Sequence, residues 1–319
     1  MALSVSLVTM PLFSSQFLAQ AKEYPEKAIK LVVGTQPGGL IDLGARAWSD
    51  EFAKGLGVPV VIFNQGGGGG TLALTDVSKS TPDGYTLAAA SQTPTVIAPA
   101  LTPNLPYNAS RDFVPIGAFG VTPSLIIVNA GSPFKTVEEL LDYAKKNPGK
   151  LNCGTAGVGT ISHFDLELVK ATHRIDLVHV PFKGSTPAVT ALLGNHVDLL
   201  FITLPALPGH LKAGRMRGLA TTTKIRQFPE IPLYSEKGLS EAGMETWAAL
   251  FAPAKIPKNV HQKLSIVFGE VVKSPAVGQK LENVGFTPRY ISPDSLAKLM
   301  KEESMRAAEI VQKAGMKTD

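Results

Sequence analysis

Residues 29–70 read IKLVVGTQPGGLIDLGARAWSDEFAKGLGVPVVIFNQGGGGG, and this stretch decides the fold of the chain. A short apolar run ends at a turn that contains Gly38 and Gly39, and apolar residues then recur at helical spacing until Gly57. A second apolar run leads into five consecutive glycines, Gly66 to Gly70. Strand, helix and strand in this order are typical of an α/β protein with parallel strands. We therefore predict two neighbouring strands that each pass through a glycine loop to a helix N-terminus.

The same unit recurs in the middle of the chain. A short strand pattern meets the glycine-rich loop Gly154 to Thr160, and a helix follows in which Ser162 and Asp165 have the spacing of an N-terminal capping box. The next strand pattern runs into the loop Pro181 to Thr186, which again precedes a helix. The repetition predicts an α/β fold of two lobes, each with a mostly parallel sheet, and a ligand cleft between them.

The order of these units suggests how the chain is divided. We expect residues 22–122 and 247–319 to form lobe 1 and residues 123–246 to form lobe 2. The chain would cross between lobes near Thr122-Pro123 and return near Thr246 to Phe251. Amphipathic helices in the C-terminal part would then pack back on lobe 1.

The first 21 residues have the pattern of a cleaved export signal. Met1 to Ala21 is apolar and uncharged and ends in Ala19-Gln20-Ala21, and polar residues begin at Lys22. The basic residue expected near the start of a leader is missing. A buried helix is the alternative, but Pro11 interrupts its periodicity. No later stretch reaches the ~20 apolar residues of a membrane span, so we expect no stable membrane insertion.

Composition excludes several functional classes. The chain of 319 residues has 31 Lys and Arg against 26 Asp and Glu, a net charge of +5, and the basic residues are scattered. A nucleic-acid binder would gather them on one face. The single cysteine, Cys153, excludes an intramolecular disulfide. No base or cation stands directly beside Cys153, so we interpret it as a packing residue and not as a nucleophile.

Glycine loops before helices are suited to binding anions. A helix N-terminus carries a partial positive charge and unpaired N–H groups, and glycine lets a ligand approach them closely. The sequence offers four such loops: Gly38-Gly39, Gly66 to Gly70, Gly154 to Thr160, and Gly184-Ser185. A tight turn would explain any one of them. Four loops at strand ends of two lobes favour one shared anion site.

Signatures of catalysis and nucleotide binding are absent from the sequence. The glycine loops match neither G-x-G-x-x-G nor a Walker loop, and no H-E-x-x-H or G-x-S-x-G motif is present. His163, Asp42 and Lys183 could each contact an anion. A structural histidine, a helix-capping carboxylate and a solvated lysine are the respective alternatives, and they stay open.

Short motifs occur in a fixed order along nearly the whole mature chain. They are Tyr24-Pro25, Pro37-Gly38-Gly39-x-x-Asp42, Gly66 to Gly70, Pro82-Asp83-Gly84-Tyr85-Thr86-Leu87, Leu105-Pro106-Tyr107, Asp112-Phe113, Gly149-Lys150-Leu151, Gly157-x-Gly159-Thr160-x-x-His163, Val178 to Ser185, Asp198 and Phe251-Ala252-Pro253-Ala254. This ordered set resembles that of a known family, the Bug-type extracytoplasmic receptors of tripartite tricarboxylate transporters.

The resemblance implies a periplasmic-binding-protein-like fold of the crossed-over type (type II), located in the periplasm. It also implies that backbone amides and bridging waters from both lobes hold the carboxylate of a small organic acid. Carried over by position, the expected ligand-binding residues are Gly38, Gly39, Leu40, Ile41, Asp42, Gly67, Gly68, Gly69, Gly70, Thr71, Thr155, Ala156, Gly157, Val158, Gly159, Thr160, His163, Lys183, Gly184, Ser185 and Thr203.

The expected partners are the carboxylate ligand and integral-membrane transporter subunits. We expect a monomer with no catalytic residue, cofactor, metal or nucleic acid. Two alternatives stay open. One is a ligand-sensing receptor for a signalling partner. The other is an enzyme acting on a small carboxylate, for which His163, Asp42 and Cys153 are the candidate groups.

Three departures from the family pattern make the expected cleft less polar. Leu40-Ile41 stands where Gly-Thr is common, Gln65-Gly66 where Arg-Pro is usual, and Ile202-Thr203 where Asp-Asn is usual. Our hypothesis is a ligand less charged than citrate, such as a monocarboxylate or an aromatic acid.

Overall fold

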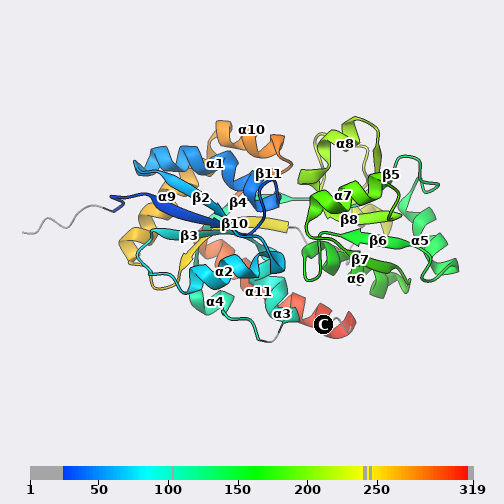
Figure 1. Cartoon of the computed structure of the whole chain (residues 1–319), viewed down its shortest axis with the longest axis horizontal. Coiled ribbons are helices and arrows are strands. Elements are labelled where there is room, and N and C mark those ends of the chain that lie inside the picture. The colour runs from blue at the N-terminus through cyan, green and yellow to red at the C-terminus, as the bar shows by residue number, and fades with distance from the viewer. Residues whose placement is uncertain (1–23, 103, 240–242, 244–245, 315–319) are drawn as a thin grey trace, which may run out of the picture.

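The computed structural model describes residues 24–314 apart from residue 103 and residues 240–242 and 244–245. Two α/β lobes lie side by side along the long axis of the molecule (Figure 1). The expected export signal, residues 1–21, lies outside the described residues. Among the helices of the described part, none has both the length and the apolar composition needed to cross a membrane.

The larger lobe is built on a six-stranded sheet. In spatial order its strands are β11 (Thr287–Ile291), β4 (Phe113–Thr122), β10 (Thr246–Pro253), β3 (Thr86–Ser91), β1 (Ile29–Val33) and β2 (Val60–Asn64). β1 pairs in parallel with β2 and with β3, as predicted for the stretch that opens the chain. β10 runs antiparallel to β3 and β4, and β11 runs antiparallel to β4.

The smaller lobe is built on a five-stranded sheet. In spatial order its strands are β7 (Val178–Pro181), β6 (Asn152–Thr155), β8 (Leu199–Thr203), β5 (Ser124–Asn129) and β9 (Met216–Thr221). β6 is parallel to β7 and β8, whereas β5 is antiparallel to β8 and β9.

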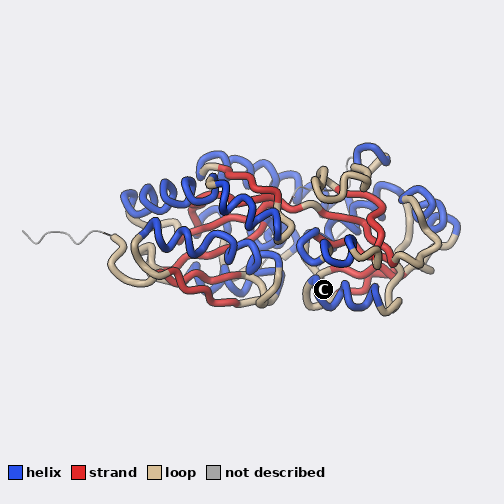
Figure 2. The backbone as a smooth tube through the Cα atoms, turned by 90° about the horizontal axis from the view of Figure 1, so that it is seen from above, coloured by secondary structure: helices blue, strands red, loops and turns tan. Residues whose placement is uncertain are grey.

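The chain passes between the lobes in strand conformation (Figure 2). β4 ends at Thr122 in the larger sheet and β5 begins at Ser124 in the smaller one. On the return, Thr246 is already the first residue of β10 in the larger sheet. Each sheet is therefore mixed and not mostly parallel. The parallel pairs are β1 with β2 and β3, and β6 with β7 and β8, whereas the pairs made by β5, β10 and β11 are antiparallel.

Helices cover both faces of each sheet. In the larger lobe they are α1 (Leu40–Leu56), α2 (Thr71–Ser78), α3 (Ala98–Leu101), α4 (Ala109–Asp112), α9 (Lys258–Lys273), α10 (Pro275–Asn283) and α11 (Pro293–Ala314). In the smaller lobe they are α5 (Val137–Lys146), α6 (Ile161–His173), α7 (Ser185–Leu193) and α8 (Pro208–Lys212). Short helical turns complete the chain: η1 (Gly68–Gly70), η2 (Thr93–Ile97), η3 (Leu204–Ala206) and η4 (Tyr234–Lys237). The C-terminal helices α9 and α11 pack on the larger lobe, as predicted.

Apolar clusters fill both faces of both sheets. On one face of the larger sheet, Trp48 and Phe52 of α1 pack edge-to-face against Phe268 of α9. The cluster on the opposite face contains residues of α2, α3 and α11, and it continues into the smaller lobe through Ile161 and Phe164 of α6. The joint between the lobes is therefore apolar on this side.

Trp48 gives a direct test of the larger core. Its side chain is fully buried, and its indole N–H has no acceptor among the described residues. We expect Trp48→Ala to lower the free energy of unfolding by about 4 kcal/mol, because it leaves a large cavity. Trp48→Phe should cost only about 1 kcal/mol, because it keeps ring contacts and removes a buried unpaired donor. Urea unfolding measures both, and equal losses would contradict this account.

Candidate functional site

The first glycine loop is held by the carboxylate of Asp42, in the first turn of α1. Its Oδ2 accepts a hydrogen bond from the amide of Gly38 at 2.8 Å, and its Oδ1 accepts from Nε of Arg46 at 2.9 Å and Nδ2 of Asn64 at 2.8 Å. Burial raises the pKa of Asp42, but these hydrogen bonds and the charge of Arg46 outweigh it and hold the pKa below its ordinary value. The side chain of Asp42 therefore supports its own loop.

The backbone at the start of α1 presents free donors. The N-cap is Gly39, which has no side chain to cap the helix. The amide of Asp42 donates to Oγ1 of Thr35, whereas no residue in the described part of the chain accepts from the amides of Leu40 and Ile41. Two N–H groups at the positive end of a helix are thus available to an anion.

The second glycine loop folds into η1 and leads directly into α2. Gly67, Gly68, Gly69 and Gly70 all have φ between +55° and +137°, a region that glycine adopts without strain. A Cβ on Gly69 would lie 2.8 Å from Cγ2 of Thr93 and 3.8 Å from the carbonyl oxygen of Gly159. The second loop, in the larger lobe, therefore approaches the third loop, in the smaller lobe. Thr71 follows as the first residue of α2, and the N-cap Gly70 provides no side-chain cap.

The third loop runs from the end of β6 to the start of α6. The N-cap of α6 is Thr160, whose Oγ1 accepts from the amide of His163 at 3.4 Å. The predicted capping box is wrong, because the helix begins before Ser162, and Ser162 and Asp165 are buried inside it. Thr160 also donates its hydroxyl to the carbonyl of Gly157 at 2.7 Å, which tightens the turn.

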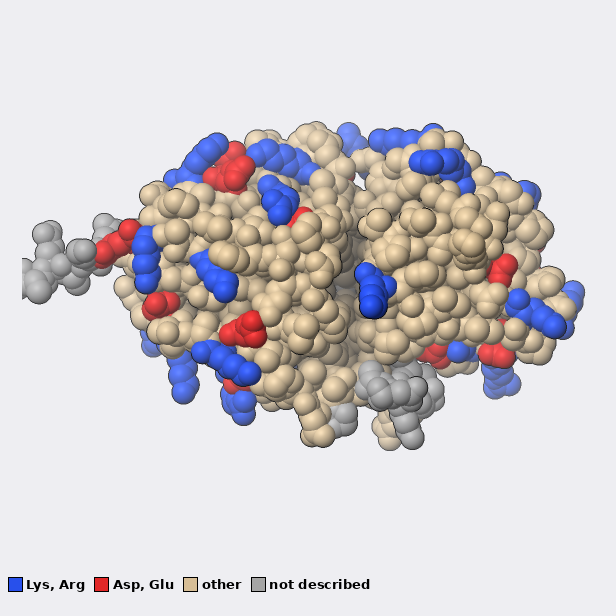
Figure 3. Space-filling model, viewed as in Figure 1, with Lys and Arg blue, Asp and Glu red and all other residues tan. Residues whose placement is uncertain are grey.

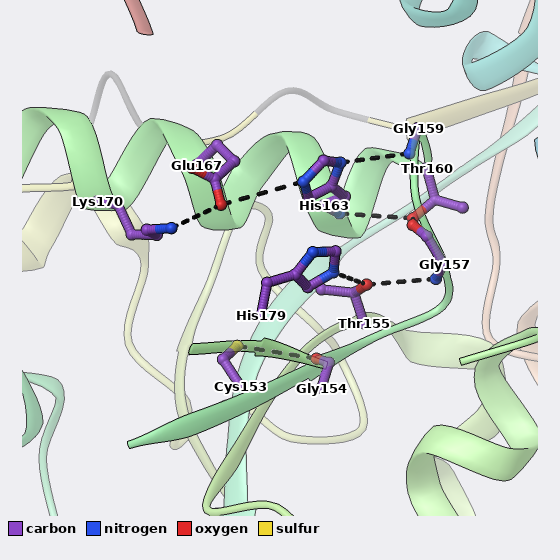
Figure 4. Close-up of polar contacts among 10 residues, drawn as sticks. All are labelled: Cys153, Gly154, Thr155, Gly157, Gly159, Thr160, His163, Glu167, Lys170 and His179. Atoms are coloured by element: carbon purple, nitrogen blue, oxygen red, sulfur yellow. Dashed lines mark hydrogen bonds and ion pairs between the residues drawn. The ribbon is translucent and has the colours of Figure 1, made fainter. Parts of the chain in front are cut away.

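Two stacked histidines lie beneath the third loop (Figure 4). The rings of His163 and His179 are 4.3 Å apart between centroids, with planes 9° apart. Nδ1 of His163 accepts from the amide of Gly159 at 3.2 Å. Nε2 of His179 is 2.7 Å from Oγ1 of Thr155, which accepts from the amide of Gly157. Burial lowers the pKa of both rings, that of His179 to about 4, so His179 is neutral at pH 7.

The fourth loop is joined to the third by backbone hydrogen bonds. The amide of Gly184 donates to the carbonyl of Ala156 at 2.9 Å, and that of Phe182 donates to Thr155 at 3.1 Å. α7 begins at Ser185 behind the uncapped Gly184. Lys183 is exposed, and it is the only lysine or arginine in the four loops. The third and fourth loops of the smaller lobe thus form one hydrogen-bonded assembly.

The remaining expected residues surround this assembly. Val158 is half-exposed at the tip of the third loop, and the amides of Ala156 and Val158 have no acceptor within the described residues. Thr203 is buried at the end of β8, opposite Ser124 in the neighbouring strand, and η3 directly after it contacts α1. Thr203 therefore lies where the two lobes meet.

Polar residues at the end of β3 were not predicted as part of the site. β3 lies beside β1, so Ser91 at its end and Gln92 and Thr93 directly after it are adjacent to the first loop. Thr93 is nearly buried, and its amide donates to Oγ of Ser91 at 3.3 Å. Its side chain is the one that meets Gly69. The sequence did contain a signal for these residues, because three polar residues come directly after an apolar strand pattern.

A furrow separates the two lobes on the face shown in Figure 3, and lysines and arginines are spread over that face without gathering there. Two other surface hollows, of about 570 Å³ beside α9 and about 480 Å³ around Phe134, contain no residue of the four loops. Within the described residues no group of three metal-ligating side chains occurs. Cys153 is fully buried, and burial raises the pKa of its thiol, in agreement with a packing role.

Asp42→Asn tests the support of the first loop. The new amide would set a donor against one of the three N–H groups that now point at the carboxylate. We expect the free energy of unfolding to fall by about 2–3 kcal/mol. Asp50→Asn, at an exposed position of the same helix, is the matched control and should be neutral. Denaturant unfolding measures the free energy of unfolding of both variants. Equal stability of the two would show that the first loop does not need the carboxylate of Asp42.

The family model for the tripartite tricarboxylate transporter family receptor matches residues 45–316. Protein BugT of Bordetella pertussis is 31% identical over 300 residues, which cover 93% of this chain and 92% of BugT.

Two solved structures superpose on nearly the whole chain. Rpa4515 of Rhodopseudomonas palustris, solved with adipate, is 28% identical with a TM-score of 0.87, over 92% of this chain and 99% of that one. MatC of the same species, with bound malate, is 31% identical with a TM-score of 0.83, over 90% and 100%. With the match to the receptor model, these similarities show that the chain belongs to the tripartite tricarboxylate transporter receptor family, whose members are periplasmic solute-binding proteins and not enzymes.

Proposed function

We propose that this protein captures a small organic acid between its lobes and presents it to integral-membrane subunits of a tripartite-type transporter. The observation that carries the proposal is the approach of the two glycine loops from opposite lobes. A Cβ on Gly69 would lie within 3.8 Å of the carbonyl of Gly159, so one small ligand could touch both.

Recognition of the acid rests mainly on backbone donors. α1 and α7 begin at uncapped glycines, and the third loop leaves the amides of Ala156 and Val158 without acceptors among the described residues. Oriented amides and helix dipoles suit a carboxylate, which accepts several hydrogen bonds at once. Lys183 is the one formal positive charge in the loops, which favours a ligand of low charge.

Two relatives support the chemical class of the ligand. Rpa4515 was solved with adipate and MatC with malate, and both acids are small dicarboxylates. A ligand that bridges the lobes makes its full set of contacts only in the closed form. It therefore shifts the population toward that form, which we propose is the form that docks on the membrane subunits.

Gly69→Ala tests the meeting of the loops. The added Cβ would clash with Thr93, at 2.8 Å, and would force a side chain into positive φ at the point where the lobes meet. We expect the affinity for the bound acid to fall by at least about tenfold. Gly209→Ala is the control, since a Cβ there meets nothing within 4 Å. Isothermal titration measures both, and unchanged affinity in Gly69→Ala would place the ligand elsewhere.

A thermal-shift series identifies the acid. The protein is unfolded and refolded to remove any bound ligand and is then tested with benzoate, malate, adipate, citrate and ATP. An acid at ~100 times its dissociation constant should raise Tm by about 5 °C. We expect mono- or dicarboxylates to bind at least about tenfold more tightly than citrate, because one lysine cannot balance three charges. A response to ATP alone would overturn the proposed function.

A further inference from the structure

Both ring nitrogens of His163 face groups of the protein (Figure 4). Nδ1 accepts from the amide of Gly159 at 3.2 Å, and Nε2 faces Oε1 of Glu167 at 4.0 Å. Glu167 is also paired with Lys170 at 2.9 Å. The side chain is buried, and its hydrogen bond from the amide of Gly159 supports the third loop from the interior of the protein.

The bond from Gly159 fixes the protonation state of this ring. An amide N–H can only donate, so the Nδ1 that receives it must carry no proton. A neutral His163 therefore carries its proton on Nε2, on the side of Glu167. A second proton would have to bind at Nδ1. It would set two N–H donors against each other and leave the amide of Gly159 without its acceptor.

The affected segment is the part of the smaller lobe that meets the larger one. Gly159 has a φ of +72°, and its carbonyl oxygen is the atom that approaches Gly69. Thr160, the next residue, is the N-cap of α6. A change at the amide of Gly159 therefore alters both the contact between the lobes and the start of the helix.

We propose that His163 is a positioning residue: its neutral ring holds the third loop in the shape that closes on the ligand, and protonation of the ring releases the loop and weakens binding. This inference rests on the proposed function, because it concerns the same carboxylate site.

The surroundings of the ring favour the neutral form at physiological pH. Burial lowers the pKa of His163 from its ordinary 6.5; Glu167 opposes this shift and Lys170 reinforces it. His179, stacked on the ring from β7, has a pKa near 4 and carries no charge above that pH. The charged groups that act on the pKa of His163 are thus Glu167 and Lys170. Of the other elements packed on α6, β8 and η2 contain no titratable residue, and Glu303 of α11 accepts hydrogen bonds from Gln92 and Trp247 of the larger lobe.

The direction of the pH effect follows from the lowered pKa. The binding-competent form is the unprotonated one, so affinity is complete above pH 6.5 and is lost as pH falls through the pKa of the folded protein. For one proton, the dissociation constant rises by up to about tenfold for each pH unit below that pKa.

The first experiment needs no ligand. Two-bond ¹H–¹⁵N correlation spectra of the full chain report which nitrogen of each histidine carries the proton, and the spectrum of His163→Asn assigns the signal. We expect the Nε2–H form for His163 at pH 7.5. A proton on Nδ1 at this pH would overturn the inference, whatever the protein binds.

The second experiment measures adipate affinity by titration calorimetry between pH 5 and pH 8. In His163→Asn, Oδ1 takes the place of Nδ1 as acceptor and does not titrate. This variant should therefore keep the wild-type affinity at pH 8 and should lose less affinity than wild type as the pH falls. His163→Leu has no acceptor and should bind about tenfold more weakly at every pH. His196→Asn, at an exposed position, is the matched control and should follow wild type.

The outcomes separate the two proposals. Parallel pH profiles of wild type and His163→Asn, or wild-type affinity in His163→Leu, would overturn the role of His163 while leaving carboxylate binding intact. If adipate and every other acid failed to bind, the proposed function would fall. The histidine spectra would then still test the hydrogen bond from Gly159. A proton on Nε2 alone at pH 7.5, with a second proton bound at Nδ1 only at low pH, would support it.

Discussion

Helices α1, α2 and α7 begin at glycines that offer no side-chain cap, and the arrangement of the candidate site depends on this feature. Buried or partly buried N–H groups require acceptors, and the first turn of a helix cannot supply its own. The loop before α2 approaches the other lobe, because a Cβ on Gly69 would lie 3.8 Å from the carbonyl oxygen of Gly159, in the loop before α6. The proposed anionic ligand would supply acceptors that the described part of the chain does not provide.

The two lobes shape their loops with different internal acceptors. In the larger lobe the acceptor is the carboxylate of Asp42, whose charge is balanced by Arg46 and absorbed by two further donors. In the smaller lobe it is the uncharged Nδ1 of His163. A carboxylate in place of this ring would add a negative charge directly beneath the loop that is proposed to bind the anionic ligand. A neutral ring gives the same hydrogen bond without that cost.

Local patterns made much of the fold predictable, and non-local ones did not. The βα units that carry the glycine loops follow from hydrophobic period and glycine placement, which act over a few residues. The antiparallel strands β4, β10 and β11 depend on partners far away in the chain and leave no local signal. The start of α6 was misplaced because Thr160 and Ser162 are both good caps, and the turn at Gly159 selects the first. Thr93 was missed because its role comes from contact with Gly69. His163 was predicted to contact the ligand, whereas its role as acceptor for the amide of Gly159 depends on a ring orientation that no motif encodes.

Helix α6 connects the third loop to the apolar joint between the lobes. Its N-terminus carries Thr160 and His163 at the cleft, while Ile161 and Phe164 pack into the apolar cluster of the larger lobe with residues of α11. The side chains of Ile161 and Phe164 thus point into the joint between the lobes, whereas the ring of His163 contacts the third loop. Because packed apolar surfaces shift between a few discrete arrangements, a change in the angle between lobes must reseat Phe164 against α11. The third loop is bonded to the same turn of helix through Thr160 and His163, so it moves with that change. In the proposed function, closure of the lobes and presentation of the loop amides are therefore one event, and a ligand that binds those amides would act directly on the joint.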